Sequence, residues 1–512
     1  EIYTLSLHDA LPIFGRAYYY ETAVNYDRIF GEHHIASMLL FNRRDWKALN
    51  ADNTTANLPY RREGIAGRVT YDYGNRYLAE FNFGYNGSEN FPKGQRYGFF
   101  PSFSIGYLVS NEKFWNIGCI NHLKIRASYG YVGNDQIGGD RFLYMSTINK
   151  GARGYPFGTT QQWISGFSEA KIAIKNVSWE ISKKTDIGID LEMFRGKVSL
   201  QADIFRENRE KILLKRRVIP HIMGITSAAV PWANLGKVNN KGFDGLLEIK
   251  NTTKSGFYYN FRGNFTFARN IVIENDEPAY KWAYQERRGK RVGQPFGLIA
   301  IGFFESQEEI DNSPKQTFMS TVRPGDIKFK DVNEDGVIDI YDQVAIGYGR
   351  DPEIMYGFGC TFGYKGIDLT LNFTGAAHTH TFLDWEGMFP FMLEYPNYNV
   401  MREYYDNRWV EGADNSEAKY PAVINGNNPN NYQTSTLYMR DAGYLRLKVA
   451  ELGYNLPKSV CDWVRIEKIR LFLNGTDLLT FDKLKIIDPE SNYGTGGYPR
   501  QRTLNIGAQL NF

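Results

Sequence analysis

The sequence predicts an all-β fold, an antiparallel transmembrane β-barrel, and three observations support this prediction. Apolar and polar residues alternate along many short segments, short and long connections between these segments alternate in turn, and the last segment alternates up to a terminal Phe512. Composition agrees, because 15% of the 512 residues are aromatic and 50 are glycine, and strands, membrane-interface belts and tight turns favour these residues. No apolar stretch is long enough for a membrane-spanning helix.

Charge and motifs exclude several classes of function. The formal net charge is only +3, so the electrostatic footprint of a nucleic-acid-binding protein is absent. The three cysteines lie far apart in the sequence, which argues against a disulfide framework. No G-x-S-x-G, Walker, CxxC or HExxH motif occurs, so we expect no catalytic site and no enzyme activity.

The alternation has a period of two. In segment 65–73, Ile65, Val69 and Tyr71 face one way, and the charged Arg68 and Asp72 face the other. The same pattern recurs in 77–85, 123–131, 187–193, 198–204, 257–267, 367–373 and 504–512, and no charged residue falls on the apolar face of any of them. A soluble sandwich alternates in the same way with its apolar face inward, so alternation alone leaves both folds open.

The connections favour the barrel. We expect strands near 15–25, 35–43, 65–73, 77–85, 97–109, 122–132, 183–193, 197–206, 242–250, 257–267, 354–363, 366–375, 442–454, 465–474 and 502–512. Short turns such as Gly74–Arg76 and Phe194–Gly196 alternate with long connections over 133–182, 207–241, 268–353, 376–441 and 475–501. Transmembrane barrels sort their loops in this way, with short periplasmic turns and long extracellular loops.

The C-terminal segment adds a second, independent indication. Its alternating residues resemble the recognition signal that the barrel assembly machinery reads in bacterial outer-membrane proteins; they are Leu504, Ile506, Ala508, Leu510 and Phe512. We therefore expect a multi-pass barrel in the outer membrane of a Gram-negative cell, in contact with membrane lipid.

Several longer motifs resemble one family, over the chain from about Phe14 to Phe512. They are ENFPKGQRYGFFPSFSIGYLVSNEKFW (Glu89–Trp115), LKIRASYGYVGND (Leu123–Asp135), the run Trp179–Phe205, NLGKVNNKGFDGLLEI (Asn234–Ile249), PGDIKFKDVNEDGVIDIYDQVAIG (Pro324–Gly347), YLRLKVAELGYNLPKSV (Tyr444–Val460) and IRLFLNGTDLLTF (Ile469–Phe481). In this order they resemble the C-terminal part of the SusC/RagA-like TonB-dependent receptors of glycan-degrading Gram-negative bacteria. The resemblance implies a plugged barrel of about 22 strands, of which this chain would hold about 15.

The same resemblance predicts the domain organisation. Residues 14–512 would be the C-terminal part of the barrel, and the signal peptide, carboxypeptidase-like extension, TonB box, plug and roughly seven strands would be missing from this chain. Residues 1–13, EIYTLSLHDALPI, lack the regions of a signal peptide. They resemble translated sequencing-adaptor read-through, so we expect them to be foreign to the protein.

The sharpest chemical motif is DVNEDGVIDIYD, which lies within the long connection at 324–347. Its spacing matches a calcium-binding loop, in which oxygen ligands on alternate residues surround a glycine turn. The predicted ligands are Asp331, Asn333, Asp335, the carbonyl of Val337, Asp339 and Asp342. The alternative is an Asp- and Gly-rich turn that binds nothing, and we expect a structural Ca²⁺ with no organic cofactor.

Aromatic residues in the predicted extracellular loops are candidates for contact with substrate or with a lid protein. They are Trp163, Trp232, Trp282, Trp385, Phe391, Tyr395 and Tyr398. Their rings would stack on sugars or grip peptide side chains, or else pack the loops together. His378 and His380 form an H-x-H pair without an evident third ligand, which is weak evidence for zinc.

The resemblance implies TonB-dependent import of nutrient oligomers across the outer membrane, glycans rather than peptides, with a SusD-like surface lipoprotein closing over the barrel. The expected partners are this lipoprotein, TonB through the missing N-terminal region, the assembly machinery, an oligosaccharide or peptide substrate and membrane lipid. The alternative from a different class is a calcium-binding surface adhesin or glycan-binding β-protein that does not transport.

Overall fold

The computed structural model describes residues 15–48, 58–136, 141–224, 229–385, 388–391, 399–490 and 500–512. Fifteen strands form one sheet in which each strand pairs antiparallel with its sequence neighbours in the sheet. In order they are β1 (Gly15–Phe30), β2 (His33–Ala48), β3 (Tyr60–Tyr73), β4 (Tyr77–Ser88), β5 (Tyr97–Leu108), β6 (Ile120–Asn134), β9 (Glu180–Met193), β10 (Val198–Lys215), β11 (Trp232–Thr252), β12 (Tyr258–Glu274), β19 (Ile354–Tyr364), β20 (Ile367–Ala377), β23 (Tyr444–Asn455), β24 (Lys468–Asp482) and β25 (Thr503–Asn511).

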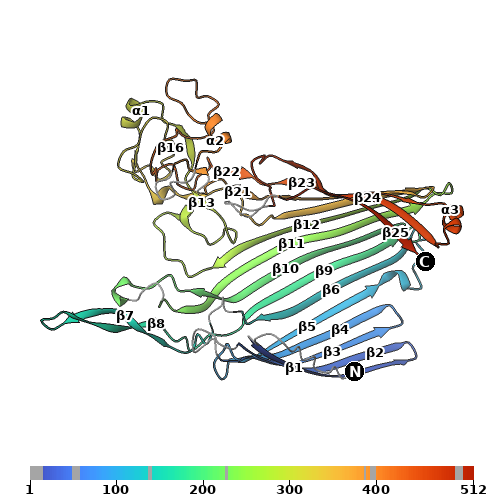
Figure 1. Cartoon of the computed structure of the whole chain (residues 1–512). Coiled ribbons are helices and arrows are strands. Elements are labelled where there is room, and N and C mark those ends of the chain that lie inside the picture. Colours follow the sequence, from blue (N-terminus) through green and yellow to red (C-terminus); the bar gives the residue numbers. More distant parts are fainter. Residues whose placement is uncertain are drawn as a thin grey trace.

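Most of the remaining described elements lie in the long connections, whereas α3 lies between β23 and β24 at the opposite end of the sheet (Figure 1). Five small two-stranded sheets pair β7 (Thr147–Phe157) with β8 (Gln162–Lys171), β13 (Phe296–Gly297) with β18 (Val344–Ala345), β14 (Ala300–Phe303) with β16 (Ile327–Phe329), β15 (Lys315–Gln316) with β17 (Val337–Ile338), and β21 (His380–Phe382) with β22 (Met439–Asp441). The helices are α1 (Gln307–Asp311), α2 (Arg402–Asp406) and α3 (Lys458–Trp463). Within the described ranges, no helix has the length and apolar character needed to cross a membrane.

The fifteen expected strands are confirmed, but several are longer than predicted. The clearest case is β11, which was expected over 242–250 and begins ten residues earlier, at Trp232. Residues 232–241 pair with β10, and from Lys237 on also with β12, but they do not alternate between apolar and polar. A strand that continues beyond the membrane has no lipid-facing side to keep apolar, so its outer part carries no periodic signal.

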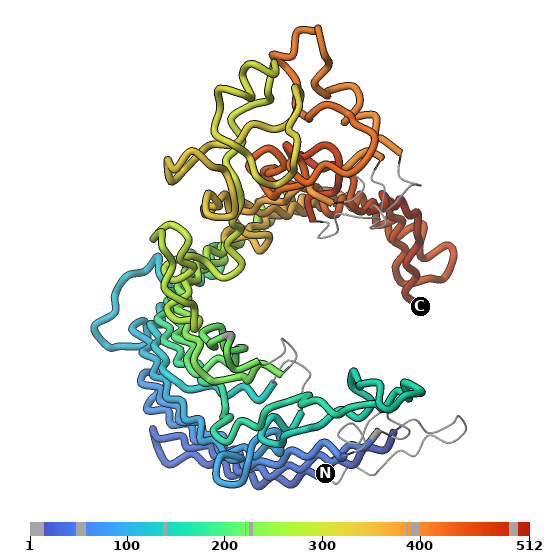
Figure 2. Tube along the Cα trace, turned by 90° about the vertical axis from the view of Figure 1, so that its left-hand side faces the viewer, coloured from blue at the N-terminus to red at the C-terminus, as the bar shows by residue number. Residues whose placement is uncertain are grey.

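The sheet curls into an incomplete cylinder with a concave and a convex face (Figure 2). Curvature brings side chains on the concave face together and spreads those on the convex face. Adjacent residues of β10 show the difference, because Ile204 is 70% exposed on the convex face and Asp203 is 8% exposed on the concave face. The apolar phase of the alternation therefore lies outside and the polar phase inside.

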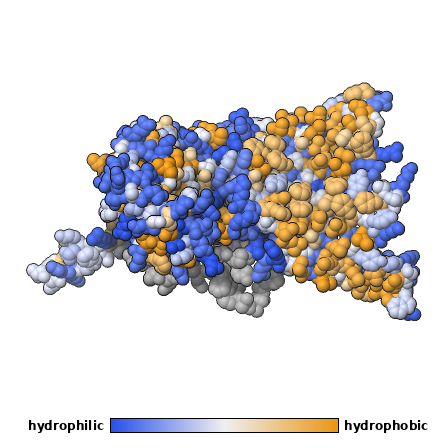
Figure 3. Space-filling model, turned by 90° about the horizontal axis from the view of Figure 1, so that it is seen from above, coloured by the Kyte–Doolittle hydropathy of each residue, from blue (hydrophilic) through white to orange (hydrophobic). Residues whose placement is uncertain are grey.

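Register makes the convex face continuous across strands. One row of register partners crosses five neighbouring strands on this face. It runs from β5 through β6, β9 and β10 to β11, and its members are Ile105, Ala127, Ile187, Ile204 and Phe243. Figure 3 shows the resulting apolar band over the strands, with a hydrophilic surface towards the long connections. A band of exposed apolar side chains on a single sheet is the lipid-facing surface expected of a membrane barrel.

The connections are sorted between the two ends of the sheet, as expected (Figure 1). At one end are short turns such as Lys365–Gly366, where φ is +49° and +86°. Positive φ at both central residues is the geometry of a type I′ hairpin turn, in which glycine adds no strain. At the other end are the long connections between β6 and β9, β12 and β19, and β20 and β23.

Substitution of Leu371 by arginine tests the assignment of the convex face. Leu371 lies mid-strand in β20, opposite Cys360 of β19 and Ala450 of β23. Leu371→Arg places a charge in lipid and is expected to lower the free energy of unfolding by about 2–4 kcal/mol. The measurement is urea unfolding of the full-length protein in lipid vesicles.

The matched control is Asn372→Arg, which places the same charge one residue away on the opposite face. We expect this control to change the free energy of unfolding much less. Equal effects of the two substitutions would contradict the assignment of lipid-facing and lumen-facing sides.

Candidate functional sites

The concave face carries a cluster of charges centred on Arg126 of β6. Its guanidinium pairs with Asp203 at 2.6 Å, Asp190 at 3.3 Å and Asp186 at 3.4 Å. A Cβ at Gly188 would lie 2.2 Å from Asp203 Oδ1, so this glycine makes room for the carboxylate. One arginine thus joins β6, β9 and β10 from inside the wall, and Asp203 is buried with a charge-assisted partner.

A second cluster follows the same plan on the C-terminal strands. Arg470 of β24 pairs through Nη2 with Asp368 of β20 at 2.5 Å and with Glu451 of β23 at 2.6 Å. Gly453 leaves space for this arginine, because a Cβ there would lie 2.4 Å from Nη2. The concave wall is therefore hydrophilic and held by cross-strand ion pairs.

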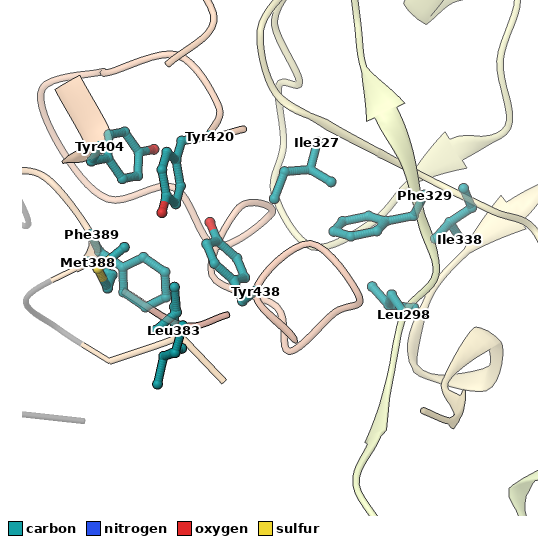
Figure 4. Packing of buried hydrophobic residues seen from close by; sticks show 11 residues of the cluster. Leu298, Ile327, Phe329, Ile338, Leu383, Met388, Phe389, Tyr404, Tyr420 and Tyr438 are labelled. Atoms are coloured by element: carbon teal, nitrogen blue, oxygen red, sulfur yellow. The ribbon is translucent and has the colours of Figure 1, made fainter. Parts of the chain in front are cut away.

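The described parts of the two longest connections fold together into a compact unit, which we call the loop cap (residues 275–353, 378–385, 388–391 and 399–443). Its core contains Leu298, Ile327, Phe329 and Ile338 from the first connection, and Leu383, Met388, Phe389, Tyr404, Tyr420 and Tyr438 from the second (Figure 4). A buried polar network supports the core, in which Asn428 and Asn431 donate to Asp326 Oδ1 at 2.7 Å and 2.9 Å. The sequence patterns did not reveal this core, because its residues follow no regular period.

The predicted cation loop, residues 331–342, lies within the loop cap. Asp331 accepts hydrogen bonds from the backbone N–H groups of Glu334 at 2.7 Å and Gly336 at 2.8 Å. Gly336 has a φ of +81°, as the predicted sharp turn requires. Asp342 is fully buried and accepts from the backbone N–H groups of Val332 and Asp339. In the ranges that the structure describes, no three His, Cys, Asp or Glu side chains converge as a metal site would require.

The loop carboxylates create a negative potential that reaches their neighbours. The pKa of the Tyr284 hydroxyl is raised, mainly because the group is partly buried. The negative charges of the loop aspartates raise this pKa further, and Asp342 contributes most among them. This hydroxyl donates to the backbone carbonyl of Tyr341 at 2.8 Å. The loop is therefore a local concentration of negative charge at the end of the sheet that carries the long connections.

The H-x-H pair does not form a metal site in the described chain. The rings of His378 and His380 stack on Tyr348, at centroid distances of 4.7 Å and 5.3 Å. His378 Nδ1 lies 3.3 Å from Glu353, and His380 Nδ1 accepts from the backbone N–H of Tyr348 at 2.8 Å. Both histidines thus have structural partners where the loop cap meets the strands.

The predicted contact aromatics do not converge on one site. Trp163 is 59% exposed on β8, and Phe391 is 40% exposed in the loop cap. Trp282 is half-buried and stacks on Tyr284 at 6.1 Å. Trp232 packs against the small core of Phe91, Leu143 and Val177, and Trp385 packs against the core of the loop cap. Tyr395 and Tyr398 lie outside the described residues.

The predicted assembly signal lies on β25 and the residue that follows it, and among the described strands β25 pairs with β24 alone. Leu504, Ile506 and Phe512 are 71%, 89% and 87% exposed, and Leu510 and Ala508 lie on the same face. Recognition by the assembly machinery remains a prediction.

One group that the sequence analysis missed is Arg446 of β23, the largest fully buried side chain in the described chain. It donates to Glu490 and Asp488, both at 2.6 Å. These carboxylates lie in the connection after β24, and this network fixes that connection to the wall. No sequence signal joins them, because the partners lie more than 40 residues apart.

The sequence has recognisable relatives. The family described as TonB dependent receptor-like, beta-barrel matches residues 2–478. TonB-dependent receptor P3 of Formosa agariphila is 28% identical over 481 residues, which cover 88% of this chain and 45% of that protein. TonB-dependent receptor SusC of Bacteroides thetaiotaomicron is 25% identical over 463 residues, covering 87% of this chain and 43% of that protein. The chain thus spans about half the length of these relatives.

A solved structure shows the same fold. The RagAB peptide transporter structure aligns over 97% of this chain and 56% of its own, with a TM-score of 0.75 and 18% identity. The matched relatives bear the names of receptors, not enzymes. The chain therefore belongs to the β-barrel family of TonB-dependent receptors, which lie in the outer membrane.

Proposed function

We propose that this chain is the C-terminal part of the barrel wall of a SusC/RagA-type receptor that imports nutrient oligomers across the outer membrane. The observation that carries the proposal is the curved fifteen-stranded sheet, apolar outside and polar inside, with its long connections gathered at one end. An apolar convex face suits lipid, and a hydrophilic concave face suits a passage for polar solutes.

The proposed substrates are glycans rather than peptides. Exposed aromatic side chains such as Trp163, and the stacked pair Trp282 and Tyr284, offer flat apolar faces on the extracellular side. The motif resemblance to receptors of glycan-degrading bacteria supports the same choice.

The proposed partners are TonB and a SusD-like lipoprotein. A lid needs a firm surface to close on, and the loop cap has its own buried core. Exposed apolar side chains on this unit, such as Ile301, Ile340 and Tyr405, suit contact with a second protein. Substrate would be captured between lid and barrel and released inward when TonB pulls on the plug.

Uptake by whole cells tests this proposal. Cells that produce the complete receptor and its lid partner are offered fluorescent oligosaccharides or peptides of similar length. We expect periplasmic accumulation of the oligosaccharide and none in a strain that lacks TonB. Accumulation of peptides alone would contradict the substrate class, whereas surface binding without accumulation in either strain would indicate an adhesin.

We also propose that the cation loop binds Ca²⁺ as a structural ion. Its support is a set of hard oxygen donors on alternate residues around Gly336, provided by Asp331, Asn333 and Asp335. None of the four loop aspartates has an ion-pair partner in the part of the chain described. Carboxylate oxygens that accept one backbone hydrogen bond keep a lone pair for a cation.

Asp335→Ala tests the calcium proposal. In the parent receptor, Ca²⁺ is expected to protect the loop cap from limited proteolysis, because binding to the folded loop alone stabilises it. The substitution removes a donor and should abolish this protection. Glu334→Ala, which removes a neighbouring carboxylate at a non-ligand position, should retain it. Unchanged calcium-dependent protection in Asp335→Ala would refute the assignment.

A further inference from the structure

The concave face carries two arginines directly opposite each other near the extracellular end of the wall. Arg44 of β2 and Arg62 of β3 are register partners, and both side chains are exposed. Like charges at directly opposite positions on one face repel and destabilise the pair of strands.

The nearby carboxylates do not neutralise both arginines. Asp135 pairs with Arg62 at 2.9 Å, and its side chain is only 10% exposed. Arg44 has no ion-pair partner among the residues that the structure describes. An anion placed between the two guanidinium groups would relieve the repulsion and accept several charge-assisted hydrogen bonds.

An aromatic row lies next to the arginine row. Trp46 and Tyr60 are register partners two residues further along the same strands, and their ring centroids are 4.6 Å apart. Tyr60 also lies against the guanidinium of Arg141, whose Cζ is 3.5 Å from the ring centroid. Arg141 is itself fixed by the backbone carbonyls of Leu58 and Pro59, at 2.8 Å and 2.7 Å. The aromatic row is therefore held in place before any ligand arrives.

The two rows line one cavity of about 230 Å³, together with Ser88, Glu89 and Asn90. Residues two apart along a strand are separated by about 7 Å. That spacing suits a pyranose ring against the aromatic row with its carboxylate between the arginines. The cavity is smaller than the ~300–1,000 Å³ typical of complete small-molecule sites, so it suits one ring of a longer chain.

We propose that this cavity is a subsite for an acidic sugar, namely a hexuronate residue of an oligosaccharide substrate. This proposal rests on the proposed function of the receptor in glycan import. Arginine provides planar, bidentate recognition of carboxylate, and the aromatic faces pack against the apolar C–H surface of the ring. A flexible acidic peptide side chain would use the arginine row but leave the aromatic row without a ring to bind. The combination of the two rows therefore favours sugar over peptide.

Binding to the purified complete receptor tests this subsite. The probes are tetragalacturonate and tetramannuronate, a neutral galactose tetramer and tetraglutamate, with affinities measured by calorimetry. We expect one of the acidic tetramers to bind more tightly than the neutral one. Arg44→Gln should weaken that binding by about 10- to 100-fold, as expected for loss of a hydrogen bond to a charged group.

The matched control is Arg43→Gln, because Arg43 is the adjacent residue on the convex face and pairs with Glu63 at 3.7 Å. The affinity of the Arg43→Gln variant for the acidic tetramer should equal that of the parent receptor. Trp46→Ala should weaken binding of the acidic tetramer about tenfold and leave tetraglutamate unaffected, because only a sugar ring packs on this row.

Several outcomes would overturn the subsite. These are equal binding of acidic and neutral tetramers, no binding of either hexuronate tetramer, an unchanged affinity in Arg44→Gln, and tetraglutamate binding as tight as that of the sugar. Uptake of a neutral glycan without hexuronate binding would refute the subsite and leave import intact. Hexuronate binding without TonB-dependent uptake would refute import and leave the subsite intact.

Discussion

Every backbone N–H and C=O in the hydrocarbon region of a membrane needs a partner inside the protein, and the rest of this structure depends on that constraint. The fifteen-stranded sheet satisfies it, since each strand from β2 to β24 is hydrogen-bonded on both sides. Strand geometry then sends alternate side chains to opposite faces. The convex face must be apolar to meet lipid, which leaves the concave face free to hold the charges of the chain.

Charges on the concave face are stable where register supplies a partner. Arg126 and Arg470 each bridge carboxylates on neighbouring strands, and Gly188 and Gly453 leave the space for these contacts. Arg44 and Arg62 depart from this rule, because register places two like charges together with one carboxylate for the pair. Arg44 and Arg62 therefore form a site of excess positive charge beside aromatic rings, at the end of the sheet that carries the long connections.

The strand positions and the sorting of the connections followed from the sequence because lipid imposes a period of two on one face. Strand segments that extend beyond the lipid do not need this alternation of apolar and polar residues. The first ten residues of β11 and the hairpin of β7 and β8 were therefore not expected as strands. The core of the loop cap was also missed, since Ile327 and Tyr438 meet through folding of two separate connections. Register alone reveals that Arg44 faces Arg62, and period-two alternation does not fix register between distant segments.

The central claim is that one face of the sheet meets lipid and the other meets water, and nitroxide scanning along β12 tests it most directly. Single labels at positions 261 to 267 of the complete receptor in a bilayer report collisions with oxygen, which dissolves in lipid, and with a polar nickel chelate. The structure predicts that oxygen collisions peak at Phe261, Gly263, Phe265 and Phe267, and that chelate collisions peak at Arg262, Asn264 and Thr266. Collision rates without this alternation, or chelate access to both faces, would contradict it.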